Sequence, residues 1–303
     1  MSRRPATPMS SVECMIREFK AKSWRAPRTL RFYRDELSTI IRTLERGGRH
    51  TFPWDITEED VKWLLDDYIK RNLTVSTRRG YISALRTWTE YYGNDVVRRM
   101  KIRWPADMRP NVDWITQAQA KELLAIPKTP AQDLVVHCEL CLGMRRVEIL
   151  RLRPDSFRGS HVEILGKGSQ GGKPRSMPYH RDTDRVVDRY LRYRKALIET
   201  VRMQRPSAVV PESLMIWARG SKLHEYGVKG SGIDEMLKPL GEEIGVRFSN
   251  HTLRRTFGRT MYRSGVEVAT ISKMMGHESI DQTLKYIGVD LDDMNSAMQT
   301  FAL

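Results

Sequence analysis

Apolar side chains recur every three or four residues through the first third of the chain, which restricts this part of the protein to amphipathic helices. The clearest run starts at Pro27 and stops at Gly47 and Gly48, because two successive glycines end a helix readily. Such helices bury one small core between them. The four expected helices cover residues 10–22, residues 27–47, the run after a capping box of Thr57 with Asp60, and the run after a cap at Ser76 or Thr77.

The chain of 303 residues is longer than one typical domain of roughly 100 to 200 residues, so we expect two domains. Residues 103–113 contain two prolines and no apolar period, which is typical of a linker. We therefore predict a helical domain over residues 1–105, a linker over 106–113 and a second domain over 114–303.

Helices are expected to dominate the second domain as well. Thr116 forms another capping box with Gln119, and the apolar run that ends at Gly143 predicts the next helix. Residues 161–179 differ, because a short apolar strand runs into a glycine-rich loop and a second short strand, which indicates a β-hairpin. The predicted fold class is mainly α, with a small antiparallel β-sheet or hairpin in the second domain.

The net charge of +15 indicates a protein that binds a polyanion, with nucleic acid ahead of anionic lipid. Residues 1–105 are the more basic part, with 22 Lys and Arg against 13 Asp and Glu. The sequence contains no basic amphipathic helix with an extended apolar face, which argues against a membrane surface. The candidate DNA contacts of the first domain, expected to point outward, are Arg25, Arg28, Arg78 and Arg79.

Neither a cofactor nor a metal is predicted. Cys138 and Cys141 lack the second ligand pair of a structural zinc site, and two small buried hydrophobes explain them better. The glycines of residues 166–173 lack the spacing of a phosphate-binding loop. Three cysteines, no signal peptide and no long apolar run favour a protein of the reducing cytoplasm.

Four basic segments of the second domain form the most informative pattern. They are GMRRVEIL from Gly143, KPRSMP from Lys173, HTLRR from His251, and GHESIDQTLKY, which ends at Tyr286. Each segment alone is weak evidence for a functional site, since an arginine at a helix start is usually a solvated surface charge. In this order and at these separations, they resemble the active-site segments of the tyrosine recombinase (phage integrase) family. The first domain resembles the core-binding domain of that family.

The resemblance implies a catalytic set in which Lys167 competes with Lys173 as the lysine of the hairpin. Arg146 and Arg255 stand where the family more often has an apolar residue and a histidine. Glu148 either orients the first arginine or is a plain surface carboxylate. The implied catalytic residues are Arg145, Lys173, His251, Arg254, His277 and Tyr286.

Phosphoryl transfer suits such a set. A phosphodiester attacked by a phenol spreads negative charge over its oxygens, and a site without metal neutralises this charge with guanidinium groups and hydrogen-bond donors. By the resemblance, Tyr286 is the nucleophile, His251 its general base, His277 a donor and Lys173 the general acid.

The implied function is that of a site-specific DNA recombinase, which cuts and rejoins DNA through a 3′-phosphotyrosyl intermediate and a Holliday junction. Its partner is double-stranded DNA that carries specific recombination sites. A type IB topoisomerase-like enzyme and a non-catalytic DNA-binding regulator are the alternatives. Both integration of a mobile element and resolution of multimers stay open.

The tail from Asp290 to Leu303 carries apolar residues on one helical face that cannot form a core alone. The family often docks such a C-terminal helix into a neighbouring protomer. We therefore expect a tetramer on DNA, with folding back within the same chain as the alternative.

Overall fold

The computed structural model describes residues 4–105, 114–166, 172, 174–227, 232–288 and 298–299. The chain divides into two compact units, Met1–Pro110 and Asn111–Leu303. The expected linker and most of the expected C-terminal helix lie outside the described residues. Within the described ranges, no helix is both long and apolar enough to cross a bilayer.

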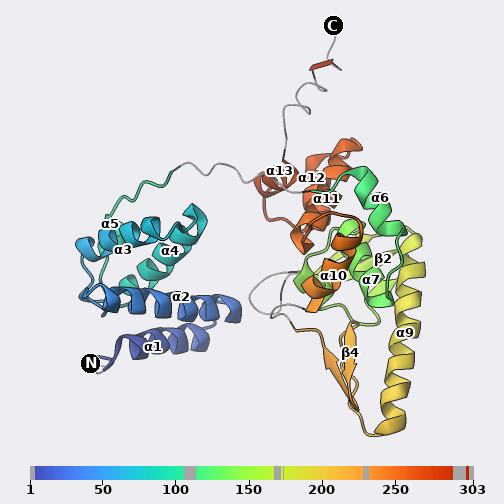
Figure 1. The fold of residues 1–303 in the computed structure, drawn as a ribbon, viewed down its shortest axis with the longest axis horizontal. Helices are drawn as coiled ribbons and strands as arrows, with labels where there is room; N and C mark the ends of the chain where they lie inside the picture. The colour runs from blue at the N-terminus through green and yellow to red at the C-terminus, as the bar shows by residue number, and fades with distance from the viewer. Residues whose placement is uncertain are drawn as a thin grey trace. The chain divides into compact units, whose positions relative to one another are not determined.

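The first unit is a small helical bundle (Figure 1). The capping box of Thr57 with Asp60 is confirmed, whereas the expected cap at Ser76 or Thr77 is wrong. Thr74 caps that helix instead, because its side chain accepts the backbone N–H of Thr77 at 3.1 Å. The helices are α1 (Pro8–Ala21), α2 (Pro27–Arg46), α3 (Glu58–Lys70), α4 (Val75–Tyr91) and the short α5 (Val96–Arg99).

The apolar faces of these helices meet in one core. Trp88 from α4 is fully buried, and its indole N–H donates to the hydroxyl of Ser11 in α1 at 3.0 Å. The hydroxyl of Tyr92 donates to the carbonyl of the same Ser11 at 2.8 Å. The expected small core is therefore present, and hydrogen bonds fasten its first and fourth helices together.

The second unit is mostly helical and contains two small antiparallel sheets, which confirms the predicted fold class. Its first helices are α6 (Gln117–Ala125), α7 (Pro130–Leu140) and α8 (Arg146–Ile149). The sheets consist of β1 (Phe157–Arg158), β2 (His161–Leu165) and β3 (Pro174–Pro178), and of β4 (Ile216–Arg219) with β5 (Lys222–Glu225). The remaining helices are α9 (Asp182–Gln204), α10 (Gly232–Glu243), α11 (Asn250–Arg263), α12 (Val268–Met275) and α13 (Ile280–Ile287).

The predicted hairpin is formed by β2 and β3, with Val162 opposite Met177. Strand β1 extends it to three strands, and the β4–β5 hairpin was not predicted. Helix α9 contacts α7 and also reaches β4 and β5, so it connects the main core to the second hairpin (Figure 1).

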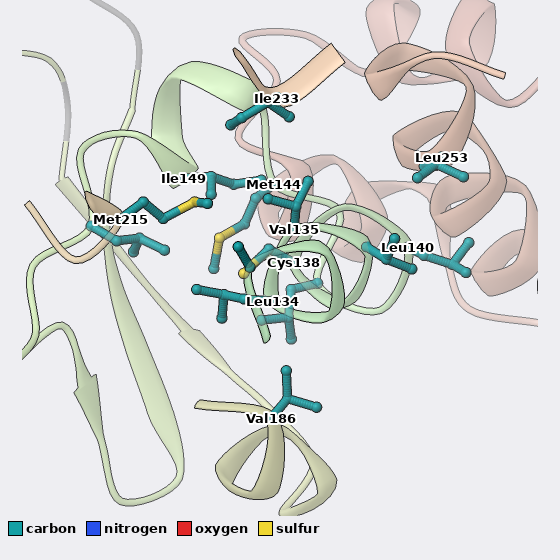
Figure 2. Packing of buried hydrophobic residues seen from close by; sticks show 14 of the residues in the cluster. Leu134, Val135, Cys138, Leu140, Met144, Ile149, Val186, Met215, Ile233 and Leu253 are labelled. Carbon is teal, nitrogen blue, oxygen red and sulfur yellow. The ribbon is translucent and has the colours of Figure 1, made fainter. Parts of the chain in front are cut away.

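Helix α7 lies at the centre of the core (Figure 2). Cys138 is fully buried among apolar side chains, and burial raises the pKa of its thiol. The helix ends at Leu140, earlier than predicted, and Cys141 is its half-buried cap. Gly143 then turns the chain with a φ of 56°, and an added Cβ there would collide with the ring of Phe257.

Glu139, also on α7, is fully buried, and neither carboxylate oxygen has a hydrogen-bond partner among the described residues. Burial, followed by the nearby charge of Asp234, raises the pKa of Glu139 well above its ordinary value. Burial therefore favours the protonated form of this side chain in the folded protein.

A Glu139→Gln variant is expected to be more stable than the wild type at neutral pH. The raised pKa means that wild-type stability is fully present below the unfolded pKa near 4.5 and declines as pH rises toward the folded pKa, by up to about 1.4 kcal/mol per pH unit. Glutamine cannot ionise and avoids this decline. Thermal unfolding of both proteins between pH 4 and pH 8 measures how their difference in stability changes with pH. A difference that is independent of pH would contradict the expectation.

Candidate active site

Glu148 lies at the centre of a cluster of arginines in the second unit. Its fully buried carboxylate accepts hydrogen bonds from Arg145 Nη1 at 2.8 Å and from Arg175 Nη1 and Nη2 at 2.8 and 2.9 Å. Arg254 Nη1 lies 3.7 Å from the same group. Burial alone would raise the pKa of Glu148, but the hydrogen bond and charge of Arg175 and the charge of Arg254 lower it to about 2. The ionised carboxylate therefore holds three guanidinium groups together.

Arg145 directly precedes α8, and its position is fixed from two sides. The carboxylate of Glu148 also accepts the backbone N–H of Arg145 at 2.8 Å. Arg145 Nη2 donates to the carbonyl of Gly276 at 2.9 Å. Because the side chain is still 22% exposed, its guanidinium is both held in place and open to a ligand.

Arg254, from α11, has a side chain that is only 2% exposed. Its guanidinium donates to the carbonyls of Gly143 and Met275, and Nη2 lies 3.1 Å from Nε2 of His277. Burial and the neighbouring charge of Arg145 lower the pKa of Arg254 to about 10, which is still well above neutral pH. Arg254 therefore provides a fixed positive charge directly behind the exposed part of the cluster.

His277 follows Gly276 and is held on both edges of its ring. Nδ1 lies 2.8 Å from Oγ1 of Thr283, and Nε2 faces Arg254. Because arginine only donates, Nε2 accepts, and in the neutral ring Nδ1 carries the proton and donates to Thr283. Burial, followed by the charges of Arg254 and Arg145, lowers the pKa of His277 to about 4. The ring is therefore neutral at physiological pH.

Tyr286, near the end of α13, has its hydroxyl oxygen 3.0 Å from Nδ1 of His251 in α11. The centre of its ring lies 5.8 Å from Cζ of Arg254 and 5.2 Å from Cζ of Arg255. The ring of His277 packs edge-on against it, with centroids 5.2 Å apart. The phenol oxygen thus lies beside an imidazole nitrogen in a positively charged environment.

Burial lowers the pKa of His251, and the charges of Arg255 and Arg254 lower it further. The imidazole is therefore neutral at physiological pH. A neutral Nδ1 with a free lone pair accepts the hydrogen of the Tyr286 hydroxyl. This arrangement suits transfer of the phenol proton to His251.

Lys173 and its alternative Lys167 lie outside the described residues. Two residues after Lys173, however, Arg175 on β3 is bound to Glu148. Its guanidinium lies against Gly276, where an added Cβ would come within 2.8 Å of Arg175 Nη1. Strand β3 is therefore fastened to the arginine cluster next to His277.

The structure brings five of the six predicted catalytic residues together, from the start of α8, from α11, from the α12–α13 turn and from α13. Sequence reasoning left the role of Glu148 open and missed two side chains of the site, Arg175 and Thr283. The signals that were available are the three-residue spacing of Glu148 from Arg145 and the arginine two residues after Lys173. The predicted residues found together are Arg145, His251, Arg254, His277 and Tyr286.

The candidate DNA contacts of the first unit differ in exposure. Arg25 and Arg28 are exposed at the start of α2, as expected. Arg78 and Arg79, near the start of α4, are half-buried, so each keeps part of its surface open to solvent. The guanidinium of Arg79 lies 5.7 Å from the ring of Trp104, which covers part of it.

In the part of the chain that the structure describes, no group of three or more His, Cys, Asp or Glu side chains is arranged to hold a metal ion. The polar centre of the second unit consists instead of arginines around one carboxylate, with two neutral histidines and a tyrosine at its edge.

Comparison with known proteins shows which family the chain belongs to. The model of the phage integrase family matches residues 113–292. The chain is 25% identical to the tyrosine recombinase XerC of Roseiflexus castenholzii, over 91% of this chain and 87% of the relative. It is 22% identical to the tyrosine recombinase XerA of Thermococcus onnurineus, over 96% of both chains.

Solved structures share the fold. The XerH site-specific recombinase bound to its difH substrate matches with a TM-score of 0.65 at 16% identity, over 98% of this chain and 86% of that one. A lambda integrase dimer bound to a core site matches with a TM-score of 0.64 at 15% identity, over 93% and 97%. Because the family model covers more than half of the sequence, the chain belongs to the phage integrase family, that of the tyrosine recombinases.

Proposed function

We propose that this protein is a site-specific recombinase that cuts and rejoins double-stranded DNA through a 3′-phosphotyrosyl intermediate. The observation that carries the proposal is the 3.0 Å contact between Tyr286 Oη and His251 Nδ1 beside the arginine cluster. The contact joins a nucleophile to a neutral proton acceptor, and the cluster offers positive charge to a phosphate. Membership of the tyrosine recombinase family supports the same reaction.

In the proposed first step, the Tyr286 oxygen attacks the scissile phosphorus while His251 takes the phenol proton. Arg145, with its partly exposed guanidinium, contacts a non-bridging oxygen of the phosphate. Arg254 supplies a fixed charge behind it, and His277 helps to hold Arg254 in place, because its Nε2 accepts from Nη2 of that arginine. Loss of one donor to such an oxygen typically costs about 10²- to 10³-fold in rate.

The bond from phosphorus to the 5′-oxygen breaks in the same step, and we propose that Lys173, or its alternative Lys167, gives that oxygen its proton. The phosphotyrosyl bond retains the energy of the broken bond, so the 5′-hydroxyl of a partner strand can reverse the step without a nucleotide cofactor. Exchange of strands between two duplexes requires four such sites. We therefore propose a tetramer on DNA that resolves a Holliday junction, held together by the C-terminal helices, in the cytoplasm.

The proposal is tested by mapping covalent adducts. The protein is mixed with sheared DNA from its source, adducts are trapped under denaturing conditions, and the attached DNA is sequenced. We expect adducts to gather at one inverted-repeat sequence. Adducts scattered over the DNA indicate a topoisomerase, and retained binding without adducts indicates a DNA-binding regulator. Either result would overturn the proposal, and family membership favours neither alternative.

The first unit is proposed to bind the DNA backbone through Arg25, Arg28, Arg78 and Arg79. Each neutralised phosphate lowers the logarithm of the binding constant by about 0.9 per tenfold increase in salt. An Arg25→Ala, Arg28→Ala double variant should therefore bind more weakly, with a slope reduced by about 2. Fluorescence anisotropy at several salt concentrations measures this slope. Lys62→Ala is the matched control, because Lys62 is already paired with Glu58 at 2.8 Å, and an equal change in both variants would contradict a specific contact.

A further inference from the structure

Two glycines form a tight neck at the base of the loop between β2 and β3. A Cβ on Gly172 would lie 2.0 Å from the carbonyl oxygen of Gly166, and the φ of Gly172 is 96°. Only glycine tolerates this approach and this backbone conformation. In the sequence, Gly166 directly precedes Lys167 and Gly172 directly precedes Lys173. Both candidate lysines are therefore bonded to the same neck.

Arg151 holds this neck closed. Its Nη1 donates to the carbonyl of Gly166 at 2.7 Å, and the same nitrogen lies 3.0 Å from the position of a Cβ on Gly172. Within the described part of the chain, Gly166 is the hydrogen-bond partner of this side chain. Since Arg151 takes no part in the cluster around Glu148, its removal leaves that cluster with all its contacts.

Arg151 belongs to the same short segment as Arg145 and Glu148, two members of the arginine cluster. Arg145, Glu148 and Arg151 follow one another at intervals of three residues. The backbone N–H of Arg151 donates to the carbonyl of Glu148 at 3.1 Å. One short segment therefore fixes the arginine that faces the phosphate, the carboxylate that orients it, and the guanidinium that holds the hairpin neck. Arg175 adds a second attachment from the hairpin to Glu148.

We propose that Arg151 is a positioning residue for the hairpin lysine, fixing the neck so that the ammonium group reaches the leaving 5′-oxygen. The inference rests on the proposed function. In the step concerned, the Tyr286 oxygen forms a bond to phosphorus, the bond from phosphorus to the 5′-oxygen breaks, and the lysine ammonium transfers its proton to that oxygen. A displacement of about 1 Å in such a group can cost 10²-fold in rate.

A substrate whose leaving group needs no proton isolates this role. The probe is a duplex carrying the site found by adduct mapping, with either oxygen or sulfur at the 5′-bridging position of the scissile phosphate. A thiolate leaves without protonation, because a thiol is far more acidic than an alcohol. Cleavage is measured in single turnovers as the rate of appearance of the tyrosyl adduct.

We expect Arg151→Ala to cleave the oxygen substrate about 10- to 100-fold more slowly than the wild type. On the sulfur substrate, the two proteins should differ by less than about twofold, because the lysine is no longer needed. Arg151→Lys, which keeps one donor for Gly166, should recover part of the rate on oxygen. Equal slowing on both substrates, or no slowing on oxygen, would overturn the proposal.

Arg153→Ala is the matched control, since Arg153 lies two residues away, is 58% exposed and pairs with Glu212 at 2.8 Å. It should cleave both substrates like the wild type. Lys173→Ala and Lys167→Ala, tested in parallel, show which lysine the neck positions, because only the catalytic one is rescued by sulfur. If the wild type forms no adduct with either substrate, the proposed function fails, and that result is distinct from failure of the Arg151 proposal.

Discussion

A Tyr286→Phe variant should form no covalent adduct with DNA, a loss of about 10⁴-fold or more relative to the wild type. The substitution removes only the hydroxyl, which is both the proposed nucleophile and the group that contacts His251. The ring keeps its contacts with His277, Arg254 and Arg255, so the fold and the DNA affinity should change little. Denaturing gels of trapped adducts, alongside binding measurements, test this expectation.

Tyr262→Phe is the matched control, because Tyr262 lies on α11 in the apolar cluster that Tyr286 also packs against. It should form adducts at the wild-type level. Adducts that persist in the Tyr286 variant would show that another side chain attacks the phosphate. Loss of adducts in both variants would point to a general effect of removing a tyrosine from this cluster.

A Glu148→Gln variant should lose about 3 to 5 kcal/mol of stability in the second unit, because three guanidinium groups lose their buried countercharge. For a unit of this size, such a loss lowers the melting temperature by roughly 10 °C. DNA cleavage should also slow, since the backbone N–H and the guanidinium of Arg145 bond to the two different oxygens of Glu148, and glutamine keeps only one of them as an acceptor. Thermal unfolding and single-turnover cleavage measure the two effects.

The contribution of Glu148 to stability depends on pH in a defined direction. The folded pKa of Glu148 is about 2 and its ordinary value is 4.5, so its contribution is fully present above pH 4.5 and declines as pH falls toward 2. Between these limits the wild type should lose stability faster than the variant. Glu163→Gln, a change at an exposed carboxylate on the neighbouring β2, is the control and should alter neither stability nor cleavage. A Glu148→Gln variant as stable as that control would contradict the buried ion pairs.

The elements that could be predicted are those with a strong local signal. The run from Pro27 and the box at Thr57 become α2 and α3, because period and caps lie within one segment. Strands β4 and β5 have only four residues each and a mixed burial pattern, so no alternation marked them. Helix α7 ends earlier than predicted, and the chain then turns at Gly143 against the ring of Phe257, a contact between residues far apart in sequence.

In the candidate site too, residues with a sequence motif could be predicted, whereas contacts between residues far apart in sequence could not. Motif resemblance identified side chains such as Arg145 and Tyr286, which the structure brings together from separate helices. It could not identify the bond from Arg175 to Glu148, because these residues are 27 positions apart and belong to a strand and a helix. Nor could it show that Glu148 is buried, since burial depends on the elements around it and a glutamate alone reads as a surface residue.

The arginine cluster around Glu148 also bears on the reorganisation energy of the reaction. The guanidinium groups of Arg145, Arg175 and Arg254 repel one another, and the work of assembling them is done when the chain folds. In the proposed reaction, a phosphodiester therefore meets charges whose positions are already fixed, and few of them need to move as negative charge develops. Bulk water around the same phosphate would have to reorient molecule by molecule during each cleavage.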